Sequence, residues 1–181
     1  KTDLEVKKLT KACQITDNTF KAVVKNLNKI KTELDLAGFI QKKIEEQGAE
    51  LSFPPIVASG KNSAVPHHQT SSGKITKGFL MIDFGAKYDG YCADMTRMLY
   101  LGSPSRKELE LYTLLLKVQQ QAINQVKLNL PYSQLDKSVR IALGKHSSKF
   151  IHSLGHGAGL ETHESPRVSS ESKDKVLKNS V

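Results

Sequence analysis

Residues 79–101 read FLMIDFGAKYDGYCADMTRMLYL, and this stretch decides the fold. Two largely apolar runs, 79–88 and 91–101, flank the dipeptide Asp89-Gly90. Asp-Gly is favoured in two-residue hairpin turns because the central positions of such turns need a positive φ. The stretch therefore predicts an antiparallel hairpin with one strand on each side of the turn.

The predicted hairpin places two carboxylates on one face. With a two-residue turn at 89–90, opposed residue numbers sum to 179, so that Asp94 lies opposite Gly85. Gly85 points to the same face as Asp83, because side chains two residues apart in a strand share a face. The carboxylates of Asp83 and Asp94 are then diagonal neighbours, with Cβ atoms about 7–8 Å apart or less. Gly85 is expected to leave room between them.

Such a pair of carboxylates suggests a cation. Asp83 lies in an otherwise apolar strand, where a buried carboxylate is costly unless it is paired or binds a metal. Two close carboxylates repel each other unless one holds a proton or a cation lies between them. Oxygen ligands suit Mn, Co, Mg or Zn, and a bridging carboxylate suits a two-metal site. The alternative is that Asp94 pairs with Arg97 or a surface lysine, and the spacing alone leaves both interpretations open.

Helices are predicted on both sides of the hairpin. Capping boxes at Thr2–Glu5 and Ser105–Glu108 each begin a helix, and further helices are expected over 32–47, ending at Gly48, and over 133–144. Helical periodicity predicts which residues of these helices face inward. They are Leu4, Leu9, Cys13, Phe20, Val24 and Leu27 in the helix that begins near Thr2, Leu34, Ala37, Ile40 and Ile44 in the helix over 32–47, and Leu109, Tyr112, Leu116 and Ala122 or Ile123 in the helix that begins near Ser105.

Short extended segments complete the pattern. Residues 53–59 (FPPIVAS) predict an extended segment with its prolines at the start or edge, and residues 150–154 predict a strand that leads into a glycine-rich turn over 155–159. The order of helices, hairpin, helices and strands predicts the α+β class.

Composition narrows the function classes. The 181 residues are 38% hydrophobic, which suits one domain with a real core, and no apolar run approaches the ~20 residues of a membrane helix, so no membrane partner is expected. The formal charge of +9 comes from lysines scattered along helical segments without stacking aromatics, so nucleic acid is not an expected partner. Cys13 and Cys92 lack metal or redox spacing, which indicates free thiols in a cytoplasmic protein.

The histidines form two groups along the chain. His67 and His68 follow Ser-Ala-Val-Pro, and a second group lies in FIHSLGHGAGLETHESPR at 150–167. A lone histidine is more often a satisfied or exposed residue than a ligand. His156 is less ordinary, because glycines on both sides allow backbone paths that other residues forbid. No phosphate-binding loop, dinucleotide fingerprint or nucleophile elbow is present.

Three stretches occur in the order found in a known family: IVASGKNSAVPHH (56–68), MIDFGAKYDGYCADMTR (81–97) and IHSLGHGAGLETHESPR (151–167). They resemble the pita-bread-fold metallopeptidases, which comprise methionine aminopeptidase, aminopeptidase P, prolidase and creatinase. The elements around His67 and His163 are most similar to the proline-specific branch. The resemblance implies an antiparallel curved sheet flanked by helices, within one catalytic domain over 1–181 that lacks the family's smaller N-terminal domain.

The resemblance also implies a dinuclear metal centre. Asp83 would bind one ion, Asp94 would bridge both, and His156 would bind the other. The ions are expected to be Mn or Co, with Zn or Fe also compatible. A metal-bridging water would become hydroxide near neutral pH and attack the scissile carbonyl. The free N-terminal amine of the substrate would coordinate a metal.

Further residues are implied at the substrate. His67 and His163 would line the substrate site and steady the scissile carbonyl and the tetrahedral intermediate, and Arg167 would support the site from behind it or from the substrate side. The expected substrate is a short peptide with proline at its second position. The choice between Xaa-Pro aminopeptidase and Xaa-Pro dipeptidase stays open, and a homodimer is compatible with the family.

The chain departs from the family pattern at its end. The family uses five protein ligands, and the last two are glutamates on strands that follow the His163 motif. Glu161, Glu164 and Glu171 do not stand in those motifs, so we expect the remaining strands beyond Val181. Two alternatives follow: a catalytically inactive pita-bread module that binds peptides or nucleic acid, or an inactive truncated fragment.

Overall fold

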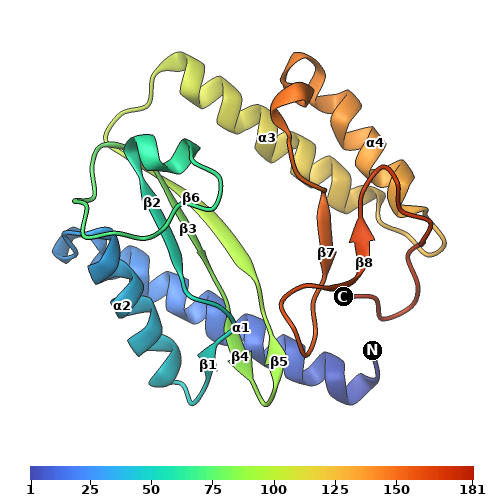
Figure 1. Cartoon of the computed structure of the whole chain (residues 1–181), viewed down its shortest axis with the longest axis horizontal. Helices are drawn as coiled ribbons and strands as arrows, with labels where there is room; N and C mark the ends of the chain where they lie inside the picture. The colour runs from blue at the N-terminus through green and yellow to red at the C-terminus, as the bar shows by residue number, and fades with distance from the viewer. The chain divides into compact units, whose positions relative to one another are not determined.

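The computed structural model describes residues 1–181 and divides them into two compact units. The N-terminal unit contains Thr2–Ser103 together with Ala158–Thr162. The C-terminal unit contains Lys1, Pro104–Gly157 and His163–Val181. Each unit has its own apolar core, so each is described by itself (Figure 1). The expectation of one catalytic domain over the whole chain stays a prediction.

The predicted hairpin is confirmed. Its strands are β3 (Gly78–Phe84), β4 (Ala86–Tyr88), β5 (Tyr91–Cys92) and β6 (Met95–Leu101). The register is the expected one, since Tyr88 pairs with Tyr91 and Asp83 pairs with Thr96. Asp89 and Gly90 have φ values of 48° and 84°, as a two-residue turn with two positive φ angles requires.

The hairpin carries two antiparallel three-stranded sheets instead of one. β2 (Ile56–Ser59) joins β3 and β6, while β1 (Glu50–Leu51), which the sequence did not predict, joins β4 and β5. The division falls at Gly85, where an added Cβ would lie 1.7 Å from the carbonyl oxygen of Ala93. We predicted that Gly85 leaves room between the two carboxylates. This prediction was wrong, because the backbone of the opposite strand fills the space beside Gly85.

The core of the N-terminal unit lies on one face of the hairpin. Leu80, Ile82 and Phe84 are fully buried there, and they pack with residues from α1 (Asp3–Asn26) and α2 (Glu33–Glu45). In Figure 1 these helices lie beside the strands of their own unit, with α1 next to β4 and β5 and α2 next to β1 and β2. The other face carries Phe79 and Tyr100, whose rings meet edge to face with centroids 5.0 Å apart, and Asp83 shares that face by alternation.

The capping boxes are confirmed, but the buried helix faces are shifted. The predicted boxes at Thr2 and Ser105 begin α1 and α3 (Arg106–Gln125), and a third box, at Thr32, which the sequence analysis did not predict, begins α2; each makes reciprocal bonds with the third residue of its helix. On α1 the buried stripe includes small and polar side chains, which allow the helix to approach the strands closely. On α3 the buried stripe contains Val118 and Ala122 and not most of the residues that were predicted. The residues buried on these helices are Leu9, Ala12, Ile15, Thr16, Thr19 and Val23 on α1, Glu33, Leu36, Ile40 and Ile44 on α2, and Val118 and Ala122 on α3. The predicted inward residues Leu4, Val24, Leu34, Leu109, Tyr112, Leu116 and Ile123 are exposed, as is Cys13.

The C-terminal unit consists of two packed helices and a short hairpin. α3 packs beside α4 (Tyr132–Leu143), which also contacts β8 (Glu164–Val168), the antiparallel partner of β7 (Gly155–Gly157). The predicted strand over 150–154 was wrong: the strand begins at the glycines instead. An added Cβ on Gly157 would lie 2.5 Å from the carbonyl oxygen of Ser165, so only glycine permits this close pairing.

The remaining elements are short. Three 3-10 helices, η1 (Leu27–Lys29), η2 (Gly60–Ala64) and η3 (Gly144–Lys149), follow α1, β2 and α4. No helix in the chain combines the length and the apolar character that a membrane crossing demands.

Candidate metal centre

Asp83 and Asp94 lie on the same hairpin of the N-terminal unit. Asp83 is half-buried on the central strand β3, between Ile56 on β2 and Thr96 on β6. Asp94 is exposed in the short gap between β5 and β6. The numbers of paired residues sum to 179 on both sides of this gap, so the register does not change across it. Asp94 is two residues from Thr96, the strand partner of Asp83, and its side chain therefore lies on the same face as that of Asp83. The carboxylates thus share the face opposite the apolar core, as the sequence predicted.

His67 lies on a loop of the same unit. The loop runs over 60–73, begins with η2 and returns towards the start of α2. His67 is exposed and has a φ of 53°, which a residue with a side chain rarely adopts. Strained backbone of this kind persists only where the surrounding contacts determine it, and it is common at functional sites.

Glu33 is a charged residue near this loop that the sequence prediction missed. It is fully buried at the first turn of α2. Burial raises the pKa of its carboxyl, but hydrogen bonds from Asn62, His68, Ser59 and Ser71 outweigh burial and lower the pKa to about 2 from an ordinary value of 4.5. The signal was present, because residues 33, 36, 40 and 44 follow one helical stripe.

This pKa predicts a dependence of stability on pH. Because the folded-state pKa lies below the ordinary value of 4.5, Glu33 contributes stability that is present above pH 4.5 and is lost as the pH falls through about 2. The full contribution is about 3 kcal/mol. Urea unfolding of wild type and Glu33→Gln should give free energies whose difference shrinks by most of this amount between pH 6 and pH 2.5. A difference that stays constant over this range would contradict the expectation.

His156 and His163 lie together in the C-terminal unit. His156 is on β7 and His163 directly precedes β8, and their ring centroids are 4.2 Å apart. Nδ1 of His156 donates to the carbonyl oxygen of Gly157 at 3.0 Å. In the neutral ring this bond leaves the lone pair on Nε2, and metal-binding histidines commonly have their other nitrogen held in this way.

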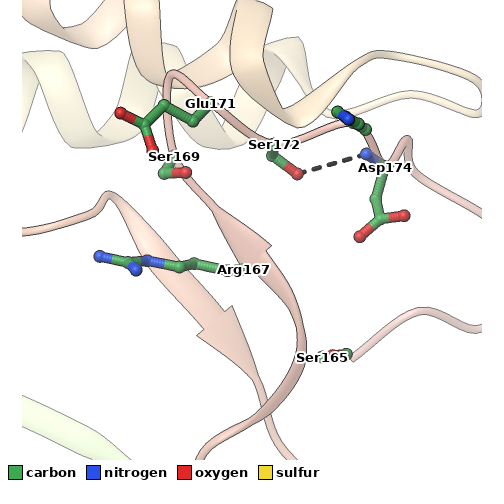
Figure 2. A pocket seen from close by; sticks show the side chains of 7 residues that line it. Ser165, Arg167, Ser169, Glu171, Ser172 and Asp174 are labelled. Carbon is green, nitrogen blue, oxygen red and sulfur yellow. Dashed lines mark hydrogen bonds between the residues drawn. The ribbon is translucent and has the colours of Figure 1, made fainter.

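Arg167 is the direct strand partner of His156 on β8. It is exposed and borders an open pocket in which hydroxyl groups and charges of both signs alternate (Figure 2). The lining residues are Ser165, Arg167, Ser169, Glu171, Ser172, Lys173 and Asp174. The guanidinium group is therefore in a position to receive an anionic group from solvent.

A buried ion pair holds the segment that leads to His156. Asp136 on α4 is fully buried and accepts hydrogen bonds from Nε of Arg140 at 2.7 Å and from the backbone of Leu154 at 3.2 Å. Arg140 also donates to the carbonyl oxygens of Phe150 and His152, both at 2.8 Å. The Asp136–Arg140 ion pair thus binds the backbone of residues 150, 152 and 154, which explains why this segment does not form a strand.

Removing this arginine should destabilise the protein strongly. Arg140→Met is expected to lower the free energy of unfolding by about 3 kcal/mol, because it leaves the buried Asp136 carboxylate without its cation. Arg106→Met is the matched control: both side chains of its ion pair with Glu110 are more than 60% exposed, so the loss should stay below about 1 kcal/mol. Equal losses in the two variants, measured by urea unfolding, would contradict the stabilising role of the Asp136–Arg140 ion pair.

The segment between the two histidines belongs to the N-terminal unit. Residues 158–162 are anchored there by a bond from the Cys92 backbone N–H to the Gly159 carbonyl oxygen at 2.7 Å. Thr162 donates its hydroxyl to the carbonyl oxygen of Ser52 at 3.4 Å. Cys92 precedes Asp94 by two residues, so the anchor lies on the carboxylate hairpin.

The candidate residues suit divalent ions in their donor chemistry. Asp83 and Asp94 offer carboxylate oxygens from one face, and His156 offers an imidazole whose tautomer is set by a backbone carbonyl. Mixed oxygen and nitrogen ligands of this kind accept Mn, Co, Zn and Fe. The donor set therefore fits the metal centre implied by the sequence.

Comparisons with known proteins identify the family of the chain. Residues 7–181 match metallopeptidase family M24. The chain is 37% identical to a protein named Xaa-Pro dipeptidase from Pyrococcus furiosus, with 100% of this chain and 53% of that protein covered. It is 39% identical to the protein of the same name from Pyrococcus horikoshii, with 93% of this chain and 49% of that protein covered. The chain thus spans about half the length of the curated relatives it matches.

Solved structures extend the match to the fold. The crystal structure of the prolidase from Pyrococcus horikoshii has a TM-score of 0.95 at 35% identity and covers 99% of this chain and 53% of that one. The pita-bread fold and the α+β class predicted from the sequence are confirmed. The chain therefore belongs to metallopeptidase family M24, in the aminopeptidase P and prolidase branch that its three sequence stretches resemble.

Proposed function

We propose that this protein is a metal-dependent exopeptidase that hydrolyses Xaa-Pro peptide bonds. The observation that carries the proposal is the pair of carboxylates, Asp83 and Asp94, on one face of a hairpin in a chain of family M24. This acid pair lies on the sheet face opposite the apolar core, and two close carboxylates repel each other unless a proton or a cation lies between them, so we assign the pair to cation binding.

Asp83, Asp94 and His156 are the proposed ligands of two divalent ions, with Mn or Co as the expected metals. His156 precedes by two residues the segment 158–162, which is anchored to the carboxylate hairpin through Cys92. The Nδ1 bond of His156 supports its role, because it leaves Nε2 with the lone pair that a metal ligand needs.

The remaining candidate residues act on the peptide itself. Bound divalent ions would supply Lewis acidity and a nucleophile at neutral pH. His67 and His163 orient the scissile carbonyl and donate hydrogen bonds to its oxygen as negative charge develops. Arg167, the strand partner of His156, offers a planar guanidinium group that supports the substrate's anionic end.

The proposed substrate is a short peptide with proline at its second position. Two relatives carry the name Xaa-Pro dipeptidase, and they match the chain over nearly its full length. Because the chain spans about half of each relative, the choice between a dipeptidase and an aminopeptidase that accepts longer peptides is a separate question.

Hydrolysis of an Xaa-Pro dipeptide by the intact protein tests the proposal. The protein should be stripped of metal with a chelator, assayed, and assayed again after addition of Mn or Co, with the matching Xaa-Ala dipeptide as a specificity control. We expect cleavage only with metal and faster cleavage of the proline peptide. Absence of cleavage with either metal would overturn the proposal, and salt-sensitive binding of nucleic acid without metal uptake would then favour a binding module.

A further inference from the structure

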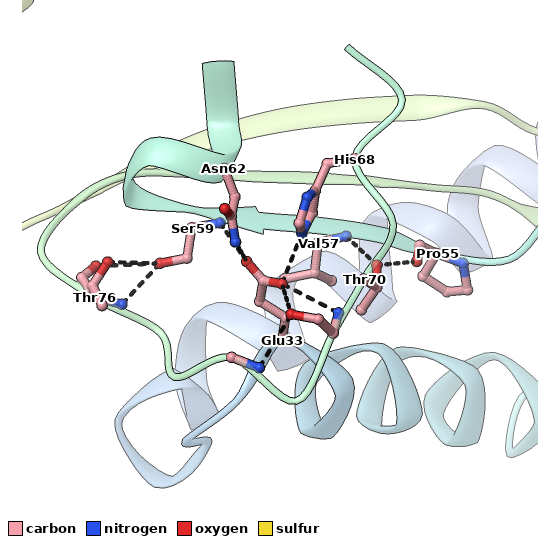
Figure 3. Close-up of polar contacts among 10 residues, drawn as sticks. Glu33, Pro55, Val57, Ser59, Asn62, His68, Thr70 and Thr76 are labelled. Atoms are coloured by element: carbon pink, nitrogen blue, oxygen red, sulfur yellow. Dashed lines mark hydrogen bonds and ion pairs between the residues drawn. The ribbon is translucent and has the colours of Figure 1, made fainter. Parts of the chain in front are cut away.

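Glu33 is a fully buried carboxylate to which the proposed chemistry gives no role. Its Oε1 accepts hydrogen bonds from the backbone N–H of Ser59 and from the side-chain amide of Asn62, both at 2.9 Å. Its Oε2 accepts from Nε2 of His68 at 2.9 Å and from the hydroxyl and backbone N–H of Ser71 at 3.0 and 3.2 Å. Five donors therefore converge on one side chain (Figure 3).

These donors come from both ends of the 60–73 loop. Ser59 and Asn62 lie where β2 passes into η2, whereas His68 and Ser71 lie on the returning half of the loop. The start of α2 adds bonds in the reverse direction, because the N–H of Glu33 donates to the Gly73 carbonyl oxygen at 3.0 Å. The first turn of α2 thus clamps the two halves of the loop to each other through side chain and backbone together.

His67 lies between the clamped positions. It is exposed, has a φ of 53°, and is not one of the five donors to Glu33. Its neighbour His68 is held by the Glu33 carboxylate, and the His68 N–H donates to the Val65 carbonyl oxygen at 3.3 Å. The strained backbone of His67 is therefore maintained by the anchored residues around it and not by its own side chain.

We propose that Glu33 is a positioning residue, which fixes the backbone of His67 so that its imidazole is held ready for the substrate. The inference rests on the proposed function, in which His67 meets the scissile carbonyl. Only a carboxylate can accept from all five donors, since a glutamine in its place has one acceptor oxygen and turns an NH2 group towards donors. A shorter aspartate would not reach both halves of the loop from the same helix position.

The test uses Glu33→Gln in the intact protein, with Glu45→Gln as the matched control because Glu45 is an exposed acid on the same helix. We expect Glu33→Gln to lower kcat/KM for an Xaa-Pro dipeptide about 10- to 100-fold, as a displaced positioning group does. Metal content should stay unchanged, since no proposed ligand is altered. Backbone amides of 60–73 should exchange with deuterium at least about ten-fold faster than in wild type, whereas the control should match wild type in every measurement.

A double-mutant cycle separates positioning from a general loss of structure. In a His67→Ala background, Glu33→Gln should lower kcat/KM by less than about three-fold, because the group through which it acts is gone. An effect of equal size in both backgrounds would overturn the proposal. If Glu33→Gln does not fold, Asn62→Ala removes one of the five bonds and should give a smaller loss with the same dependence on His67.

The exchange measurement distinguishes failure of the inference from failure of the proposed function. Wild type that does not cleave Xaa-Pro peptides overturns the proposed function, while faster exchange in 60–73 alone would still establish Glu33 as the clamp of the loop. Unchanged exchange in this loop overturns the inference whatever the activity of the wild type.

Discussion

Asp94→Asn is expected to abolish most of the proposed peptidase activity of the intact protein. Asparagine has the size of aspartate but no negative charge, and we propose that Asp94 is the carboxylate shared by both ions. We expect kcat/KM for an Xaa-Pro dipeptide to fall about 1,000-fold or more, which corresponds to about 4 kcal/mol of lost transition-state stabilisation. Metal analysis of the purified variant should show fewer than two ions per chain.

Asp89→Asn is the matched control for this change. Asp89 lies on the same hairpin, carries the same charge, and pairs with Lys8 at 2.7 Å on the surface. Asparagine accepts the φ of 48° found at this turn position, so folding should not suffer. The control should keep kcat/KM within about two-fold of wild type, as loss of a surface ion pair affects little. Retained activity in Asp94→Asn, or equal losses in both variants, would contradict the proposed site.

Gly85→Ala, which adds a single methyl group to the hairpin, is expected to destabilise the protein strongly. The new Cβ would lie 1.7 Å from the carbonyl oxygen of Ala93 and 2.5 Å from its carbonyl carbon. Relief requires the two backbones to separate, which breaks the bond from the Ala93 N–H to the Ala86 carbonyl oxygen at 2.9 Å. We expect the free energy of unfolding to fall by about 4 kcal/mol or more.

Gly38→Ala gives the opposite expectation for the same chemical change. Gly38 is an exposed position inside α2, and a Cβ added there would meet no heavy atom within 4 Å. Alanine in a helix interior is favoured over glycine by up to about 1 kcal/mol, so this variant should be slightly more stable than wild type. Urea unfolding of the two variants side by side measures the contrast. Similar stabilities would show that the close approach at Gly85 is not a constraint.

The hairpin and the helix starts could be predicted from sequence because their signals are local. Asp89-Gly90 encodes two positive φ angles, and from that turn the register of Asp83 and Asp94 follows by counting. Thr2 and Ser105 each bond within three residues of themselves, so their capping boxes need no knowledge of the rest of the fold. The carboxylate face of the candidate site is therefore a property of a short stretch.

The helical stripe indicated that residue 33 is buried, but the hydrogen bonds that make a buried glutamate tolerable there could not be predicted, because its partners are distant in sequence. Glu33 accepts from Ser59 and Ser71, which lie 26 and 38 positions away, so its cost of burial is offset only once the loop has folded. Leu34 was predicted to face the core because it is apolar, yet it is exposed. The strand predicted over 150–154 was wrong for a similar reason. The carbonyl oxygens of Phe150 and His152, which a strand would pair with another strand, accept hydrogen bonds from the Arg140 side chain instead.

The central claim is that Asp83 and Asp94 share a pair of divalent ions with His156. The most direct test is an anomalous difference map from crystals of the intact protein soaked in Mn. The proposal predicts two peaks at the carboxylates of Asp83 and Asp94, with the Asp94 carboxylate in contact with both ions and His156 in contact with one. Peaks elsewhere, or Mn bound at the carboxylates without His156, would contradict it.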